Sequence, residues 1–532
     1  MKRLLILICL CLMAGIDAFA YDFAVNNIYY NKLSDDKCAV TFGDKYYVGT
    51  VNIPTSVIYK GASLTVTSIG EFAFRGCKNL TELTIGSSVE SIALNAFAGC
   101  TGIESLSVDL GNTVFDSRDN CNAIISTATN ALQRACNTTK IPSTVTCIEW
   151  AAFSYCHGLK SIDIPNSVTK IRANAFQDCI NLTSVNLPNS LIYIGSEAFS
   201  GCSSLSDITL PNSVISIGGH AFNGCTSIDK PIFNENAFVF MPKTYKGDYT
   251  IPANVAVISQ YAFAGCMELT GVTIPSSVEN IGSFAFNGCT SLTQINLPNS
   301  IQSIELSTFS GCKALQSIVI PNSVETINAY AFSGCSSLST ATIGYSVAEI
   351  GANAFSKCPQ LTKVYACMLE PNTPTQTPFD IDESGKIPAT LYAPAQYIGN
   401  YTANTYWSKF ADVQEWNGAE TIAATAITLN ETEKTIQTEY GTQLTATLSP
   451  EYCSPIVVWS TSNPSVATVS NKGYVIAVGI GKATITATTP SGLTATCQIN
   501  VTSNDGKTDQ KSISKKLSAI ESLMSKTINR IK

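Results

Sequence analysis

Hydrophobic residues recur along this chain in a fixed pattern, which is clearest in residues 181–202 (NLTSVNLPNSLIYIGSEAFSGC). The pattern ends with Ala-Phe-x-x-Cys, and eight of the ten intervals between successive cysteines of this motif are 23 residues long. A period of this length predicts a solenoid, in which each repeat forms one coil and stacks on the next. The cysteines of the series are Cys77, Cys100, Cys156, Cys179, Cys202, Cys225, Cys266, Cys289, Cys312, Cys335 and Cys358.

Within one repeat, the alternation of polar and apolar residues predicts a short strand. Val185 and Leu187 alternate with Ser184 and Asn186, so one face of the strand is buried. Pro188 ends the strand because proline has no N–H to donate to a neighbouring strand. The apolar residues that follow predict a second limb whose side chains also point inward. A single repeat cannot bury this much apolar surface alone, so neighbouring coils must cover one another.

The register Cys-x-x-Leu-x-x-Ile-x-Leu, with Leu-Pro after the strand and Ala-Phe before the cysteine, resembles the BspA-like (treponemal-type) leucine-rich repeat family. The resemblance extends over roughly residues 21–416. It implies an α/β-type repeat solenoid with a curved parallel sheet and a mostly irregular convex side. It also implies a role in adhesion, because BspA-like proteins are implicated in attachment to host proteins and to other bacteria.

A different pattern begins near residue 425, where short alternating segments are separated by turn residues. This pattern predicts an all-β Ig-like sandwich. Trp459 with the Ser-Thr-Ser-Asn-Pro that follows it, and the later Gly473 and Gly479, resemble the group-2 bacterial Ig-like domain. We expect Trp459 to lie in the core of this domain.

The two ends of the sequence carry their own signals. Residues 1–20 begin with Lys2 and Arg3, continue with a short apolar run and end in Ala-Phe-Ala, which predicts a signal peptide. No later run is long enough to cross a membrane, so we expect an exported protein that is secreted or held at the cell surface. Residues 504–532 place apolar residues three or four apart, as in an amphipathic helix. Packing on another surface, self-association and a membrane-surface role all remain open for this tail.

These patterns predict seven segments. They are a signal peptide (1–20), an N-terminal cap with a degenerate first repeat (21–69), a repeat solenoid (70–366), a C-terminal cap (367–416), a linker (417–424), an Ig-like domain (425–503) and the amphipathic tail (504–532). We expect a hairpin near the start of the N-terminal cap, and a helix from about Ala395 to about Phe410 in the C-terminal cap.

Two insertions, near residues 110–140 and 230–250, lengthen the repeat. Both resemble variant repeats of the family in which a hairpin replaces the simple coil, and both tolerated loop growth and a binding role are open. The second insertion gathers aromatic residues that the repeat pattern does not require, which makes it the preferred contact region. Its candidate binding residues are Phe238, Phe240, Met241, Tyr245 and Tyr249.

The cysteines of the repeat are expected to be structural. They occupy the inward position of the repeat, where a thiol packs and can donate to the backbone of the adjacent coil. Their Cβ vectors run parallel, which is poor geometry for a disulfide, so we expect free buried thiols. Pairing of Cys121 with Cys136, and of Cys453 with Cys497, remains open.

No pattern indicates catalysis, a metal or a cofactor. The chain has two histidines, neither of which lies near a nucleophile motif, and it has no nucleotide-binding fingerprint and no Cys/His cluster with zinc spacing. Only 13% of residues are charged and the net charge is −7, which gives no basic surface for nucleic acid. We therefore expect a protein that is not an enzyme.

Binding is expected on the outward positions of the repeated strand, five and seven residues after each cysteine. On the concave sheet these positions form a mostly uncharged ladder that could bind an extended partner, although such residues also serve solubility alone. The candidates are Ser161, Asp163, Ser184, Asn186, Asp207, Thr209, Gln294, Asn296, Thr340, Thr342, Lys363 and Tyr365.

The sequence thus predicts an exported cell-surface or secreted adhesion protein whose partner is an extracellular protein or glycan, such as one of the host matrix. A glycan-capture accessory protein and a structural spacer without a ligand are the two alternatives. Saturable binding to a matrix protein, binding to glycans alone, or no binding at all would distinguish the three.

Overall fold

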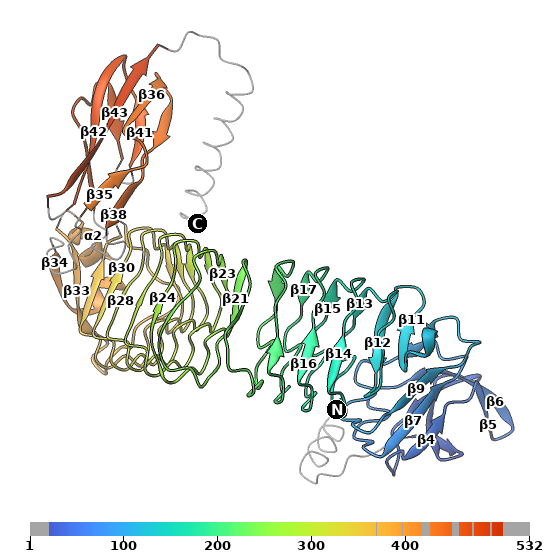
Figure 1. Ribbon diagram of the computed structural model, residues 1–532. Helices are drawn as coiled ribbons and strands as arrows, with labels where there is room; N and C mark the ends of the chain where they lie inside the picture. The colour runs from blue at the N-terminus through green and yellow to red at the C-terminus, as the bar shows by residue number, and fades with distance from the viewer. Residues whose placement is uncertain are drawn as a thin grey trace.

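The computed structural model describes residues 21–368, 370–395, 397–416, 426–449, 457–470, 473–489 and 492–503. A long stack of coils leads from an N-terminal sheet to a C-terminal cap, and a β-sandwich follows (Figure 1). The expected repeat solenoid followed by an Ig-like sandwich is therefore confirmed. The expected signal peptide, linker and tail lie outside the described residues. None of the described helices has the length and apolar character to span a bilayer.

The N-terminal cap is a mixed sheet with the order β1-β2-β3-β6-β5, to which β8 is added beside β6. The expected hairpin is present as the antiparallel pair of β1 and β2. The solenoid begins where parallel pairing brings consecutive coils into register. There β8 pairs with β6, and β7 pairs with both β4 and β9. The strands are β1 (Phe23–Val25), β2 (Ile28–Lys32), β3 (Lys37–Thr41), β4 (Gly49–Asn52), β5 (Ser56–Tyr59), β6 (Ala62–Ile69), β7 (Leu80–Ile85), β8 (Ser91–Ile92) and β9 (Ser105–Val108).

The middle of the solenoid shows what one regular coil contributes. Each coil gives one strand to the sheet β14-β16-β18 and a two-residue strand to a second parallel sheet, β13-β15-β17-β19. The second limb is thus more regular than expected. The first insertion adds the strands β10, β11 and β12, which pair antiparallel with one another. The last of them, β12, joins the second sheet by pairing parallel to β13. The elements are β10 (Phe115–Asp116), η1 (Arg118–Asn120), β11 (Ala123–Ser126), β12 (Ala131–Ala135), β13 (Cys147–Ile148), β14 (Ser161–Asp163), β15 (Lys170–Ile171), β16 (Ser184–Asn186), β17 (Tyr193–Ile194), β18 (Asp207–Ile208) and β19 (Ser216–Ile217).

The third part of the solenoid starts with the second insertion, whose strands β20 and β21 form an antiparallel hairpin. Its coils then repeat the same two-strand arrangement up to β32. The strands are β20 (Ile232–Phe233), β21 (Ala237–Phe240), β22 (Gly247–Thr250), β23 (Val257–Ile258), β24 (Leu269–Thr273), β25 (Asn280–Ile281), β26 (Gln294–Asn296), β27 (Ser303–Ile304), β28 (Ser317–Val319), β29 (Thr326–Ile327), β30 (Thr340–Ile343), β31 (Glu349–Ile350) and β32 (Lys363–Ala366).

The C-terminal cap extends the last sheet with β33 (Ile387–Pro394) and β34 (Phe410–Trp416). The helix between them, α2 (Ile398–Ala403), is shorter than expected, and a separate 3-10 turn, η2 (Trp407–Lys409), follows it. Tyr401 and Trp407 are fully buried and seal the end of the core.

The C-terminal sandwich has three sheets, ordered β36-β43-β42-β39, β37-β41-β40 and β35-β38. Trp459, which we expected inside the core, is half-buried and packs against it. The strand β36, which the sequence pattern missed, runs parallel to β43. The strands are β35 (Ala426–Leu429), β36 (Glu433–Gln437), β37 (Gly441–Gln443), β38 (Ala446–Ser449), β39 (Val458–Thr461), β40 (Ala467–Val469), β41 (Tyr474–Ala477), β42 (Gly481–Thr488) and β43 (Thr494–Thr502).

The apolar interior of the solenoid is divided into three cores, and the two insertions form the boundaries. In β11, Ile124 belongs to the first core, whereas Ala123 and Ile125 belong to the second. In β21, Val239 belongs to the second core and Phe238 to the third. Because successive side chains of a strand point to opposite faces, one inserted strand serves two cores at once.

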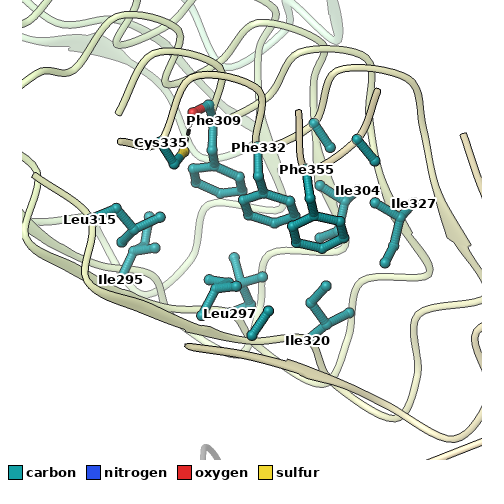
Figure 2. Close-up of a cluster of buried hydrophobic side chains, with 14 of the residues drawn as sticks. Ile295, Leu297, Ile304, Phe309, Leu315, Ile320, Ile327, Phe332, Cys335 and Phe355 are labelled. Atoms are coloured by element: carbon teal, nitrogen blue, oxygen red, sulfur yellow. Dashed lines mark hydrogen bonds between the residues drawn. The ribbon is translucent and has the colours of Figure 1, made fainter. Parts of the chain in front are cut away.

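Inside each core, a ladder of phenylalanine rings runs beside the row of cysteines. Phe309, Phe332 and Phe355 stack with ring centroids 5.3 and 5.1 Å apart (Figure 2). The thiol of Cys335 donates a hydrogen bond to the carbonyl oxygen of Phe309 in the preceding coil, at 3.2 Å. The repeated Ala-Phe-x-x-Cys therefore supplies both a stacking ring and a buried donor for each coil.

Candidate binding surfaces

The outward positions of the repeated strands form what we call the polar strand surface, defined as Ser161, Asp163, Ser184, Asn186, Asp207, Thr209, Gln294 and Asn296. Parallel pairing sets Ser161 beside Ser184, Ser184 beside Asp207, and Asp163 beside Asn186. All of these side chains are exposed except Ser184, which is half-buried. The result is a row of hydrogen-bonding groups repeated from coil to coil.

The C-terminal end of the expected ladder is only partly exposed. Thr340 is half-buried and Lys363 is exposed, but Thr342 and Tyr365 are each only 2% exposed. The ring of Tyr365 lies 5.0 Å from Trp416 and 4.8 Å from Tyr392, so strands of the C-terminal cap cover it. For Thr342 and Tyr365, the expectation of outward-facing binding residues is wrong.

The polar strand surface is also interrupted. The sheet β14-β16-β18 ends at β18, and β22-β24-β26 is a separate sheet that begins after the second insertion. Gln294 and Asn296 pair with Gly271 and Thr273 in that later sheet. The expected continuous ladder is therefore two shorter surfaces, because the hairpin β20–β21 separates the coils on either side.

The aromatic residues of the second insertion are mainly core residues. Phe238 is fully buried and its ring stacks on Phe263 at 4.6 Å, which makes it a member of the phenylalanine ladder. Met241 is also buried, Tyr249 packs against Phe238, and Tyr245 packs against Tyr249. Burial raises the pKa of the Tyr249 hydroxyl. Phe240 is half-buried beside Phe222. The expectation of an exposed aromatic contact region here is corrected.

The cysteines of the repeat all lie inside the solenoid. Each of the eleven is buried and free. Eight donate to the phenylalanine carbonyl of the preceding coil, whereas Cys77, Cys156 and Cys266 meet other carbonyls. Cys121 and Cys136 are also free, and they belong to different cores. Cys453 lies outside the described residues, so its pairing with Cys497 stays a question.

A half-buried aromatic row was not anticipated from the sequence. The rings of His220 and Tyr261 lie 3.5 Å apart between centroids, and those of Tyr261 and Phe284 lie 4.8 Å apart. All three stand directly before Ala-Phe, and all three have a positive φ, at 59°, 62° and 59°. Burial lowers the pKa of His220. Comparing the residue directly before Ala-Phe in successive repeats would have revealed this row, because that residue is aromatic in these three repeats.

Chemistry of other kinds has little support in the described part of the chain. No group of three or more His, Cys, Asp or Glu side chains there could hold a metal ion. Asp163 and Asp207 lie on β14 and β18, with β16 between them, so they do not form an adjacent pair of carboxylates.

Comparison with known proteins gives the chain two family matches. The BspA type leucine rich repeat region matches residues 41–131, 123–251 and 236–362, and the bacterial Ig-like domain (group 2) matches residues 423–499. Both are families that are typically non-enzymatic.

Similar solved structures include a leucine rich cell surface protein from Faecalibacterium prausnitzii A2-165, which is 26% identical with a TM-score of 0.42. That match covers 66% of this chain and 96% of the other. A leucine-rich repeat protein from Bacteroides ovatus is 27% identical over 67% of this chain and 100% of its own, with a TM-score of 0.37.

Among curated relatives, an alpha-L-arabinofuranosidase from Bifidobacterium longum is 38% identical over 111 residues. The match covers 19% of this chain and 10% of the relative, so this chain spans about a tenth of that relative's length. The repeat match extends over more than half of the chain. This chain therefore belongs to the BspA-type leucine-rich repeat family, and it carries a group-2 bacterial Ig-like domain after its repeats.

Proposed function

We propose that this chain is an exported bacterial protein that acts at the cell surface, or after secretion, as a binding and adhesion protein. The observation that carries the proposal is the polar strand surface, where seven of the eight polar side chains are exposed and recur at the same register positions. The proposed partner is an extracellular protein such as one of the host matrix. This proposal agrees with the adhesive role that the family implies.

The physical basis is the spacing of the coils. Neighbouring parallel strands lie about 4.8 Å apart, so short hydroxyl and amide groups recur at a regular distance along the surface. Such a row can exchange its bound water for hydrogen bonds to an extended partner, and several weak bonds then act together. Because most of these groups are uncharged, we expect only a modest dependence of binding on salt.

The test is binding of the mature protein to immobilised matrix proteins and to a glycan array. The variant combines Ser184→Glu, Asn186→Glu, Gln294→Glu and Asn296→Glu, which places four carboxylates on the polar strand surface. A matched control carries the same four charges at exposed positions off this surface, as Ser216→Glu, Asn254→Glu, Asn280→Glu and Gln302→Glu.

Saturable binding to a matrix protein that the variant loses and the control keeps would support the proposal. Binding to glycans alone would favour a glycan-capture accessory protein. If the wild-type protein binds no matrix protein and no glycan, a structural spacer becomes the better description. Equal loss in the variant and the control would remove the polar strand surface from consideration.

Export is tested separately. Expression of the full sequence in a bacterial host that secretes proteins should yield an extracytoplasmic product that begins at Tyr21. Intact mass measurement of the product checks this. A product that keeps residues 1–20 and remains in the cytoplasm would contradict the proposed export.

A further inference from the structure

The phenylalanine ladder has a gap at the first insertion. The rings of Phe74 and Phe97 stack at 5.4 Å, and those of Phe153 and Phe176 stack at 4.7 Å. In the coil between these pairs, Ala135 takes the backbone place of the ladder residue. Its N–H donates to the carbonyl of Ala152 at 2.8 Å, as the N–H of Phe153 donates to Ala175 at 2.7 Å. This coil therefore contributes no ring to the ladder.

The residue before Ala135 brings a charge to this gap. Arg134 is 6% exposed, and its guanidinium lies 5.4 Å from the centroid of the Phe97 ring. Its Nη1 donates to the carbonyl of Ala151 at 3.0 Å, and its Nη2 donates to that of Ser154 at 3.2 Å. Its buried Nε has no hydrogen-bond partner among the residues that the structure describes. A guanidinium has five N–H donors, so these two bonds leave most of its donors unused.

In the described part of the chain, no carboxylate compensates the charge of Arg134. None of the described acidic residues forms an ion pair with it, and Glu149, which lies nearby, pairs instead with Arg172 at 3.1 Å. A buried charge without a partner is costly, whereas pairing with an anion relieves that cost. The Arg134 guanidinium is therefore a site that an incoming anion can satisfy.

A pocket of about 220 Å³ lies at this point, between the second regular repeat and the first insertion. The half-buried side-chain amides of Asn95 and Gln133 line it, and neither amide has a hydrogen-bond partner among the described residues. Trp150, Tyr155 and the exposed Leu94 supply aromatic and apolar lining. The pocket thus combines an unpaired cation, free amides and an aromatic wall.

We propose that this pocket binds a sugar acid, that is, a monosaccharide unit bearing a carboxylate. The carboxylate pairs with the Arg134 guanidinium, because the planar fork of arginine matches a carboxylate. The hydroxyl groups bind the amides of Asn95 and Gln133, and the apolar face of the sugar ring packs against Trp150. A neutral sugar would leave the charge of Arg134 without an anion.

The test is isothermal titration calorimetry of the mature protein with sodium glucuronate, glucose and N-acetylglutamate. Glucuronate should bind, and glucose should bind at least about tenfold more weakly, because a hydrogen bond to a charged group contributes enough to produce such a ratio. Arg134→Gln should weaken glucuronate binding by a similar factor. The matched control is Arg75→Gln, which removes an exposed arginine that lies over the Phe72 ring outside the pocket.

Because Arg134 also binds two backbone carbonyls, Gln133→Ala is a second variant, and it should weaken glucuronate binding without lowering the melting temperature. Failure of wild-type protein to bind glucuronate, or unchanged binding in both variants, would overturn the proposal. Binding of N-acetylglutamate as tight as that of glucuronate would overturn its sugar component. None of these results would affect the proposal for the polar strand surface, because that surface lies on other strands and is tested with other variants.

Discussion

The thiol of Cys335 donates to the carbonyl of Phe309, 26 residues earlier in the sequence and one coil away in the structure. Cys335→Ala removes this donor and opens a small cavity, although the carbonyl still accepts the backbone N–H of Cys312, at 3.2 Å. We expect the free energy of unfolding to fall by about 1–2 kcal/mol. Cys335→Ser, which keeps a donor, should lose less. Chemical denaturation checks both, with Cys147→Ala, at a half-buried position, as the control expected to change least.

Thiol reactivity should follow burial. Burial raises the pKa of Cys156, Cys266 and Cys358 from 9.0 to about 12, so these thiols hold almost no thiolate at pH 8. We expect them to react with a thiol-specific disulfide reagent only after denaturation. Mass spectrometry of labelled peptides checks this, and rapid labelling of Cys266 in the native protein would contradict it.

The same raised pKa values predict how stability depends on pH. The folded protein holds these protons to a higher pH than the unfolded chain does, so their contribution is complete below about pH 8. It is lost as pH rises from about 9 toward 12, at up to about 1.4 kcal/mol per pH unit for each thiol. Denaturant titrations at a series of pH values check the trend. A Cys266→Ala variant should show a shallower loss.

The phenylalanine ladder should be the most sensitive part of the core. The ring of Phe332 stacks on Phe309 and Phe355 at 5.3 and 5.1 Å. Phe332→Ala should therefore cost about 3–5 kcal/mol. Phe233 is 40% exposed, so Phe233→Ala should cost far less. Thermal unfolding of the two variants provides the comparison, and equal shifts would contradict a stabilising role for the ladder.

One glycine of the repeat is required by the close approach of neighbouring coils. A Cβ at Gly282 would lie 2.6 Å from the backbone nitrogen of Gln260, so Gly282→Ala should destabilise the protein by about 1–3 kcal/mol. At Gly399, within α2, nothing lies within 4 Å of the added Cβ. Gly399→Ala should be neutral or stabilising by about 1 kcal/mol, because alanine favours the helix. The melting temperatures of the Gly282→Ala and Gly399→Ala variants, compared with that of the wild-type protein, test both expectations.

The regular coils could be predicted from the sequence because each repeat obeys one rule of burial. The strand face of residues 184–186, the inward cysteines and the ladder rings all follow from their position within the repeat. The Ig-like sandwich was predictable for a similar reason, although β36 was missed. The pattern of that strand, EKTIQ, contains one buried residue, which is too little to distinguish a strand from a loop.

The insertions and the cap were less predictable, because burial there depends on distant segments. Phe238 looked like a surplus aromatic residue, but the hairpin brings it onto Phe263. Tyr365 occupies an outward position of its strand, yet Trp416 covers it from the far end of the cap. Arg134 carries no sequence signal of a site, since its role depends on the missing ring beside it. These contacts arise from tertiary packing, which a repeat pattern does not encode.

The strands that serve two cores would have a mechanical consequence for the surface-held protein that we propose. When the chain is pulled from its ends, the force passes from one core to the next through β11 and β21. Each of these strands has one face in each of two neighbouring cores. We expect the protein to unfold under force in separate steps, one core at a time, while the other cores stay folded. We expect a surface-held protein built in this way to lengthen gradually under flow while most of its coils stay folded.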